Sequence, residues 1–262
     1  MPGPTRQPGP RENDIQRPAS GAGGDIVIVH SSDLHVGDVA TTQACGGDEV
    51  LPLRQVIHAA NAVTADLVLL AGDVFEHNRL PDDLLERTAR LLGDAGLPVV
   101  ILPGNHDPAT ADSVYRRGGM ADPDNVSILG VTHGKAVTFP GLELEVWGHA
   151  HLDYDDMIPL RSPRPRRTRW QVAMAHGHYE TAPDRGAALN PAWLIGRDEI
   201  VETGVDYLAL GHWNRATRVA SGDVAAYYCG SPDLSETVNV VRLRTDGRVA
   251  VRRRRLVGKT EI

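Results

Sequence analysis

Three runs of apolar residues in the first half of the chain are separated by two amphipathic segments. The runs at residues 25–29, 67–70 and 98–102 are rich in Val, Ile and Leu, which is typical of strands buried in a parallel sheet. Residues 51–65 and 81–92 carry apolar side chains at the spacing of one helical face, and the second segment begins with a proline, a favoured first helical residue. The pattern predicts a β-α-β-α-β unit, whose crossovers are nearly always right-handed.

The second half of the chain is richer in short segments of β type. They lie at residues 126–129, 136–139, 142–147, 170–175, 207–210, 224–228, 238–244 and 248–255. An Asp-Gly pair at positions 246 and 247 separates the last two and is a strong hairpin signal. Because the strands of the two halves have similar layouts, we predict an α/β fold with a two-sheet β-sandwich core and flanking helices. We expect a single domain over residues 25–262.

Composition narrows the class of protein. Residues 1–24 are rich in Pro, Gly and Arg, and we expect them to form a disordered leader. No apolar stretch approaches the roughly 20 residues of a membrane helix, and the N-terminus lacks the apolar core of a signal peptide. Cys45 and Cys229 match no zinc or redox spacing, so we expect free thiols and a cytoplasmic protein. The formal net charge of −7 disfavours a surface that coats nucleic acid generally, although a local basic face is compatible with it.

Five short polar motifs follow directly on five of the predicted strands. They read Asp33-Leu34-His35, Gly72-Asp73, Gly104-Asn105-His106-Asp107, His176 and Gly211-His212. Open α/β sheets build their sites at the carboxyl ends of the strands, so we expect these side chains at one edge of one sheet. Oxygen and imidazole donors without a thiolate predict a metal site, and manganese, iron and zinc all accept such ligands.

The donor set suits two divalent ions about 3.5–4 Å apart, which together can clamp a phosphoryl group and activate a water. Such a pair needs a bridging carboxylate. Asp73 is the natural bridge, because it follows the second strand on a tight turn. Asp33 and His35 are two residues apart at an extended strand end and point to the same side, so they can hold one ion.

The remaining motifs supply the second ion and the catalytic group. Asn105, His176 and His212 come from other strand ends and can hold the second ion. His106, next to Asn105, would then face away from the metals and toward the substrate. There it can steady phosphate charge or protonate the leaving alkoxide.

The ordered motif set resembles the calcineurin-like metallophosphoesterase superfamily over most of residues 25–240. The resemblance implies a four-layer α/β/β/α fold, two divalent metal ions with manganese favoured, and hydrolysis of phosphoric esters. It also implies that Glu76, three residues after the bridging Asp73, orients the catalytic His106. The family usually ends its pattern with Gly-His-x-His, whereas this chain has Asn214 at the last position. Asn214 would therefore be a weaker ligand of the first metal than the usual histidine.

Within the superfamily, the chain is similar to the SbcD-like DNA exonuclease branch. The similarity lies in the stretches at residues 70–75, 98–108, 207–212 and 227–232, of which the last contains a Tyr-x-Gly-Ser-Pro element. It implies a phosphate-ester substrate, with DNA ends as a candidate, and no membrane partner. An ATPase partner is common in that branch but is not indicated by this sequence. Longer relatives carry a capping domain after this point, and we expect none in this chain.

Other interpretations remain open. The substrate alternatives are a small phosphodiester, a cyclic nucleotide or a phosphomonoester, and Asn214 also fits a weakly active or inactive member that binds phosphate. The motif Gly148-His149-Ala150-His151 matches Gly-His-x-His, but it precedes His176 and so breaks the family order. Arginines at 161–169 and 252–255 are either phosphate-binding groups or a solvated loop and a charge-protected edge strand.

Overall fold

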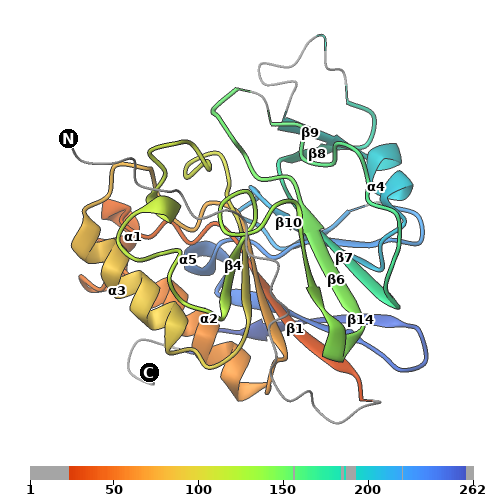
Figure 1. Cartoon of the computed structure of the whole chain (residues 1–262), viewed down its shortest axis with the longest axis horizontal. Coiled ribbons are helices and arrows are strands. Elements are labelled where there is room, and N and C mark those ends of the chain that lie inside the picture. Colours follow the sequence, from red (N-terminus) through yellow and green to blue (C-terminus); the bar gives the residue numbers. More distant parts are fainter. Residues whose placement is uncertain (1–23, 156, 184–185, 187–192, 220, 258–262) are drawn as a thin grey trace, which may run out of the picture.

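The computed structural model describes residues 24–155, 157–183, 186, 193–219 and 221–257. All of the predicted leader except residue 24 lies outside these described residues. Two six-stranded sheets pack face to face, with helices on their outer faces (Figure 1). The predicted fold class, an α/β two-sheet sandwich with flanking helices, is confirmed.

The first sheet combines four parallel strands with an antiparallel hairpin. Its order is β14 (Val249–Arg255), β13 (Thr237–Leu243), β1 (Ile26–Ser31), β2 (Leu67–Ala71), β3 (Val99–Leu102) and β4 (Val126–Ile128). The strands from β1 to β4 are parallel, and β13 and β14 run antiparallel to their neighbours. The hairpin predicted from the Asp-Gly pair is therefore present.

The second sheet has four parallel strands flanked by antiparallel edges. Its order is β11 (Thr217–Arg218), β12 (Ala225–Tyr228), β10 (Tyr207–Gly211), β7 (Trp170–His176), β6 (Leu144–Gly148) and β5 (Ala136–Phe139). A separate two-stranded sheet pairs β8 (His178–Glu180) with β9 (Leu194–Gly196). The prediction of one sheet edge is wrong, because β7 and β10 belong to this second sheet. Buried parallel strands look alike in sequence, and only long-range pairing decides which sheet each one joins.

Helices complete the outer layers. On the first sheet lie α2 (Leu51–Ala62) and α3 (Asp82–Gly93), and on the second lies α4 (Arg197–Thr203). Two single-turn 3₁₀ helices span Val114–Arg116 and Pro140–Leu142. Sequence patterns missed α4 and two shorter helices, α1 (Val39–Ala44) and α5 (Pro232–Ser235). Such short helices carry little periodic signal and depend on local caps, as in α1, where the Asp38 carboxylate accepts the Thr41 N–H at 2.6 Å.

Side chains of the central strands alternate between two apolar layers. On β1, Val27 and Val29 pack toward the helices, whereas Ile26 and Ile28 pack toward the second sheet. A third apolar cluster covers the far side of the second sheet and includes Ile200 of α4. These three clusters separate four layers, α/β/β/α. No helix in the described part of the chain combines the length and apolarity needed to cross a membrane.

A buried polar pair links the two sheets. His30 on β1 is fully buried, and its Nδ1 lies 2.8 Å from the hydroxyl oxygen of Tyr207 on β10. Burial disfavours the imidazolium form and lowers the pKa of His30 to about 3. The interior therefore holds this histidine in its neutral form.

The neutral state of His30 predicts a pH-dependent stability. Between its ordinary pKa of 6.5 and the folded value of about 3, the unfolded chain binds more protons at this site. Stability from His30 is thus complete above pH 6.5 and decreases as the pH falls, by up to about 1.4 kcal/mol per pH unit. We expect His30→Gln to flatten this slope in urea unfolding measured below pH 6.5. His58→Gln, on the exposed face of α2, should leave it unchanged. Equal slopes in His30→Gln and the unmodified chain would contradict the assignment.

Candidate metal centre

The polar motifs meet where the parallel strands of both sheets end. Asp33, Asp73 and Asn105 follow β1, β2 and β3 of the first sheet, whereas His176 ends β7 and His212 follows β10 of the second. In the register of the second sheet, His176 pairs with the residue before His212, and the two imidazole centroids lie 5.4 Å apart. The site is therefore assembled across the sandwich, with both carboxylates from the first sheet and the imidazoles of His176 and His212 from the second.

Asp73 occupies the centre of this cluster. Its Oδ1 accepts the backbone N–H of His106 at 2.9 Å, and its Oδ2 lies 3.1 Å from Nε2 of His176. Only glycine fits beside it, since a Cβ on Gly104 would lie 2.2 Å from the Asp73 Oδ1. Gly72 is constrained in the same way, because its Cβ would lie 2.1 Å from Nδ1 of His176. The glycines of two sequence motifs thus allow the close approach of a carboxylate and an imidazole.

Asp73 and Asn105 each place an oxygen near Nε2 of His176. Its Nδ1 donates to the carbonyl of Ala71 at 2.9 Å, which turns Nε2 toward Asp73 and toward Oδ1 of Asn105 at 2.9 Å. Burial opposes protonation of His176, but the Asp73 carboxylate overcomes it and raises the pKa to about 9. A proton on Nε2 then satisfies both oxygens, and a divalent cation can take the place of that proton. Burial with the charge of His176 lowers the pKa of His212 to about 4, so this imidazole has the neutral form that a metal ligand needs.

A second group of donors involves the same carboxylate. One potential ligand atom from each of Asp33, His35 and Asp73 lies within 4.8 Å of the others. Burial and the negative charge of Asp73 raise the pKa of Asp33, although His176 opposes the shift. Burial alone would lower the pKa of His35, but Asp73, Asp33 and Glu76 raise it instead. Two buried carboxylates that repel each other are well matched to a bound cation, so the residues fit a two-metal centre.

The backbone around these residues is strained. Left-handed φ angles occur at Asp33 (54°), His35 (47°), Asp73 (50°) and His212 (103°). They account for half of the eight non-glycine residues with positive φ in the described part of the chain. Each such conformation costs about 1–3 kcal/mol and persists where the surrounding structure enforces it. The strain is therefore concentrated at the candidate ligands.

Glu76 contacts both remaining histidines of the site. Its carboxylate lies 2.7 Å from Nδ1 of His35 and 3.5 Å from Nδ1 of His106. Nδ1 of His106 also donates to the backbone carbonyl of Glu76 at 3.0 Å, which leaves Nε2 of this half-exposed ring available. The shorter contact shows that Glu76 orients His35 at least as closely as it orients His106, a pairing that the sequence did not indicate.

Asn214 is placed differently from the other candidates. It is exposed, and its side chain makes no hydrogen bond with another described residue. Two nearby histidines could take its place. Nδ1 of His77 accepts the backbone N–H of Arg79, and Nδ1 of His178 accepts the indole N–H of Trp213 at 3.0 Å, while the ring of His178 lies 6.0 Å from that of His212. The contacts in the structure give Asn214 no link to the cluster.

Two other motif residues have structural partners. Asp107 accepts the backbone N–H groups of Gly104 and Phe75 and the hydroxyl of Tyr115, at 2.7, 3.0 and 2.5 Å, and so ties the two loops together. His151 is buried and donates through Nε2 to the carbonyl of His176 at 2.8 Å. Close groups of three acidic or imidazole donors among the described residues include neither His149 nor His151. The Gly-His-x-His match at 148–151 thus packs against the site rather than within these groups.

An aromatic wall of Trp193, Trp213 and Tyr228 lies around the segment that carries His212, and Tyr228 within it is fully buried. Trp213 stacks on Tyr228 with ring centroids 4.5 Å apart, and the half-buried Trp193 has its ring 5.8 Å from that of His212. Sequence reasoning missed this wall, because the three aromatics lie in separate segments. Only Trp213, adjacent to His212, carried a local signal.

The first arginine cluster is largely committed to structure. Arg164 pairs with the buried Glu145 at 3.1 Å, Arg166 pairs with Asp206 at 2.7 Å, and Arg169 donates to the backbone carbonyl of residue 245 at 2.9 Å. Such bonds fix the loop before β7, so they favour a structural role for these arginines over phosphate binding.

Comparison with known proteins places this geometry in context. The model of the calcineurin-like phosphoesterase family matches residues 26–215. The chain is 26% identical over 230 residues to the uncharacterized metallophosphoesterase YhaO of Bacillus subtilis, covering 79% of this chain and 53% of YhaO. It is 24% identical over 232 residues to the DNA double-strand break repair protein Mre11 of Methanopyrus kandleri (79% and 48% covered). It is also 24% identical over 246 residues to a subunit of the nuclease SbcCD of Escherichia coli (78% and 60% covered).

The matched relatives are longer than this chain, which spans about half to three-fifths of their length. A solved structure, TT1561 of Thermus thermophilus, superposes with a TM-score of 0.53 at 13% identity, covering 88% of this chain and 99% of that one. This likeness concerns the fold alone.

The close approach at Gly104 gives a test of the assembled centre. A Cβ at this position meets the Oδ1 and the backbone nitrogen of Asp73, at 2.2 and 2.5 Å, so Gly104→Ala must displace the central carboxylate. We expect Gly104→Ala to lower manganese affinity at least tenfold in calorimetric titration and to destabilise the fold by about 1–3 kcal/mol. Gly134→Ala is the matched control, since a Cβ there meets no atom within 4 Å. Manganese affinity that is the same in both variants would contradict the central position of Asp73.

Proposed function

The chain belongs to the calcineurin-like phosphoesterase family, and we propose that it is a metal-dependent phosphodiesterase that acts on the ends of DNA. The observation that carries the proposal is the convergence of Asp33, His35, Asn105 and His176 on the buried carboxylate of Asp73. Support for a nucleic-acid substrate comes from the names of two relatives, a DNA repair protein and a nuclease subunit. The half-buried Trp193 beside His212 adds a flat surface of the kind on which bases stack.

Two divalent cations, with manganese favoured, would be held in this centre. Asp33, His35 and Asp73 would hold the first, and Asp73, Asn105, His176 and His212 the second. When bound, the cations supply Lewis acidity toward a phosphoryl group and an activated water. Asp73 would serve both cations, because its carboxylate belongs to both groups of donors.

His106 is the proposed general acid. Its backbone N–H is fixed by Asp73, and its Nδ1 is held by the carbonyl of Glu76. This leaves Nε2 of a half-exposed ring to give a proton to the leaving alkoxide of the substrate. Glu76 keeps His35 and His106 in their relative orientation, with the two rings edge to face at 4.9 Å.

The proposal is tested by turnover with added manganese. We expect hydrolysis of bis(4-nitrophenyl) phosphate to exceed that of 4-nitrophenyl phosphate, and end-labelled DNA to be shortened from its ends. Faster turnover of the monoester, with intact DNA, would identify a small-molecule phosphatase instead. Manganese binding without hydrolysis of any of the three would identify a phosphate-binding member without activity.

Two variants separate the roles of the residues in this assay. We expect His106→Ala to retain manganese but to lose at least a hundredfold in kcat, in line with the loss of a general acid. Asp73→Ala should lose both ions, because both groups of donors include its carboxylate. Calorimetric manganese titration distinguishes the two, and full activity of His106→Ala would exclude this histidine as the proton donor.

The exposed Asn214 leads to a gain-of-affinity prediction. Asn214→His restores an imidazole at the last position of the family pattern, and imidazole is a better ligand for manganese than a carboxamide. We expect the weaker of two manganese sites to bind more tightly, by about tenfold, in the same titration. Unchanged affinity would mean that the backbone keeps this position away from the first site.

A further inference from the structure

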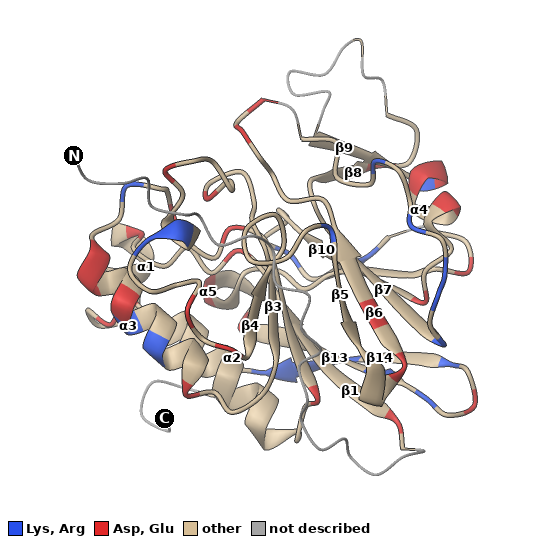
Figure 2. Ribbon diagram, viewed as in Figure 1, with Lys and Arg blue, Asp and Glu red and all other residues tan. Residues whose placement is uncertain are grey.

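A strong local concentration of positive charge lies outside the metal centre. Residues 242–255 contain seven arginines and one aspartate, although the whole chain has a formal net charge of −7. These residues form most of the β13–β14 hairpin, in which the basic residues are coloured blue and four of them end β14 (Figure 2). The chain therefore carries a basic edge on its first sheet.

Four of these arginines are bonded within the protein through their side chains. The bonds join Arg255 to Glu236, Arg244 and Arg248 to Asp246, and Arg253 to the carbonyl of Ala216. The side chains of Arg252 and Arg254, in contrast, make no hydrogen bond or ion pair with any other described residue. Arg252 is exposed and Arg254 is half-buried. These two guanidinium groups are available to an external partner.

Strand register places the two arginines side by side on one face. Arg252 pairs with Val240 and Arg254 pairs with Val238, and both valines belong to the apolar cluster on the helix side of the sheet. Positions two apart on a strand share a face, so Arg252 and Arg254 form a short row on that side. β14 is an edge strand of the first sheet, so this row lies at the edge of that sheet.

The basic end of β14 is adjacent to the metal centre. Arg255 pairs with Thr237, which closely follows α5. Arg253 bonds to Ala216, which lies two residues after Asn214 and four after His212. The end of β14 is thus close to the segment that carries a candidate metal ligand, although Arg253 faces the side of the sheet opposite to Arg252 and Arg254.

We propose that Arg252 and Arg254 form a binding site for the phosphate backbone of a nucleic-acid strand whose end enters the metal centre. The inference rests on the proposed function for its substrate but adds a surface away from the metal ligands. Guanidinium groups bind phosphate bidentately, and a row of them suits a ligand that repeats its charge along its length. Charged side chains on an edge strand also discourage pairing with a strand of another protein.

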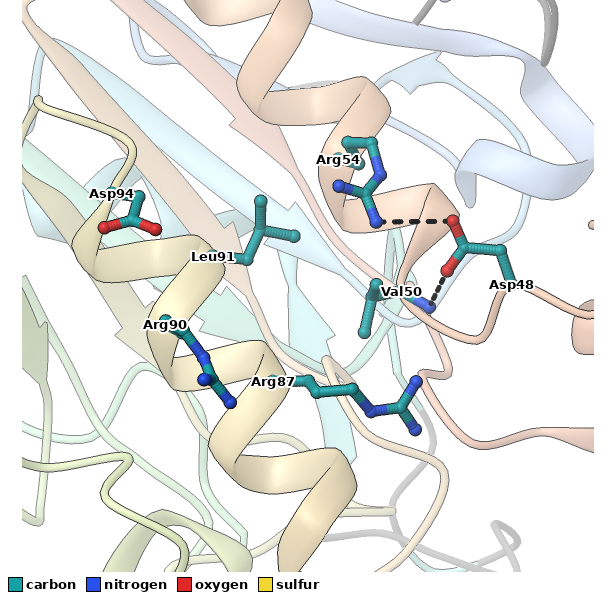
Figure 3. A pocket seen from close by; sticks show the side chains of 7 residues that line it. All are labelled: Asp48, Val50, Arg54, Arg87, Arg90, Leu91 and Asp94. Atoms are coloured by element: carbon teal, nitrogen blue, oxygen red, sulfur yellow. Dashed lines mark hydrogen bonds and ion pairs between the residues drawn. The ribbon is translucent and has the colours of Figure 1, made fainter.

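Another arginine-rich surface, between α2 and α3, serves as a control. It is a pocket of about 280 Å³ lined by Asp48, Val50, Arg54, Arg87, Arg90, Leu91 and Asp94 (Figure 3). Here Arg54 pairs with Asp48 at 3.4 Å, and Arg87 pairs with Glu49 at 2.6 Å. Acidic partners offset the charge of this pocket, so it should contribute little to the binding of a polyanion.

The experiment compares two double variants of the whole chain that lose the same charge. Arg252→Gln with Arg254→Gln removes the row, and Arg87→Gln with Arg90→Gln removes two arginines of the control pocket. Binding of a fluorescent single-stranded oligonucleotide is followed by anisotropy in EDTA, so that no turnover occurs, over a series of salt concentrations. We expect the first variant to bind roughly tenfold more weakly at low salt, and its slope of log K against log salt to fall by about 1.4. The control should match the unmodified chain.

The outcomes separate this site from the proposed function. Equal affinity and slope in the two double variants would overturn the arginine site. So would binding of polyglutamate by the unmodified chain as tightly as the oligonucleotide, because the site would then not be specific for a phosphate backbone. Circular dichroism verifies that both variants are folded, and Arg252→Gln alone should give about half of the change in slope. If the unmodified chain hydrolyses the small diester but binds no oligonucleotide, the arginine site fails while the phosphodiesterase stands. If it binds the oligonucleotide through the arginines without hydrolysing any diester, the enzyme proposal fails instead.

Discussion

The buried carboxylate of Asp73 is the interaction on which the rest of this structure depends. One of its oxygens holds the backbone of the loop after β3, and the other holds an imidazole from the second sheet. These bonds bring together loops that lie about thirty and one hundred residues apart in the chain. Removing one partner of such a buried pair leaves an uncompensated charge, which typically costs about 3–5 kcal/mol. The carboxylate therefore fixes how the two halves of the sandwich meet at this edge.

Strain and charge at this edge have a common explanation. Four candidate ligands adopt left-handed backbone conformations, and two carboxylates are buried close enough for one to raise the pKa of the other. Neither feature stabilises the fold by itself. Both are compensated by hydrogen bonds in the surrounding loops, such as the three that Asp107 accepts. Both also hold donor atoms in place for a cation, so the folding free energy that they cost is linked to metal binding.

The two sheets make different contributions to the site. The first provides the carboxylates and, through β14, a row of arginines at its edge. The second provides the imidazoles of His176 and His212, and Trp213 stacks on the buried Tyr228 of its strand β12. The proposed nucleic-acid substrate presents negative charge and flat bases together, to which the arginine row and the half-buried Trp193 are suited. The small groove between α2 and α3 lacks this combination, because its arginines are matched by acids.

The sequence by itself determined the strands, the main helices and the residue types of the centre. Long apolar runs such as those of β1 and β2 can only be buried, and short polar motifs at their ends can only lie at a sheet edge. Tertiary structure alone decided that His176 and His212 come from a second sheet, since the sequence of a buried parallel strand does not indicate which strands it pairs with. It also decided that Glu76 contacts His35, that Trp193 lies beside His212 and that Arg164 is neutralised by Glu145. Each of these pairs joins residues far apart in the chain, and such contacts depend on how strands pair and loops pack rather than on any local pattern.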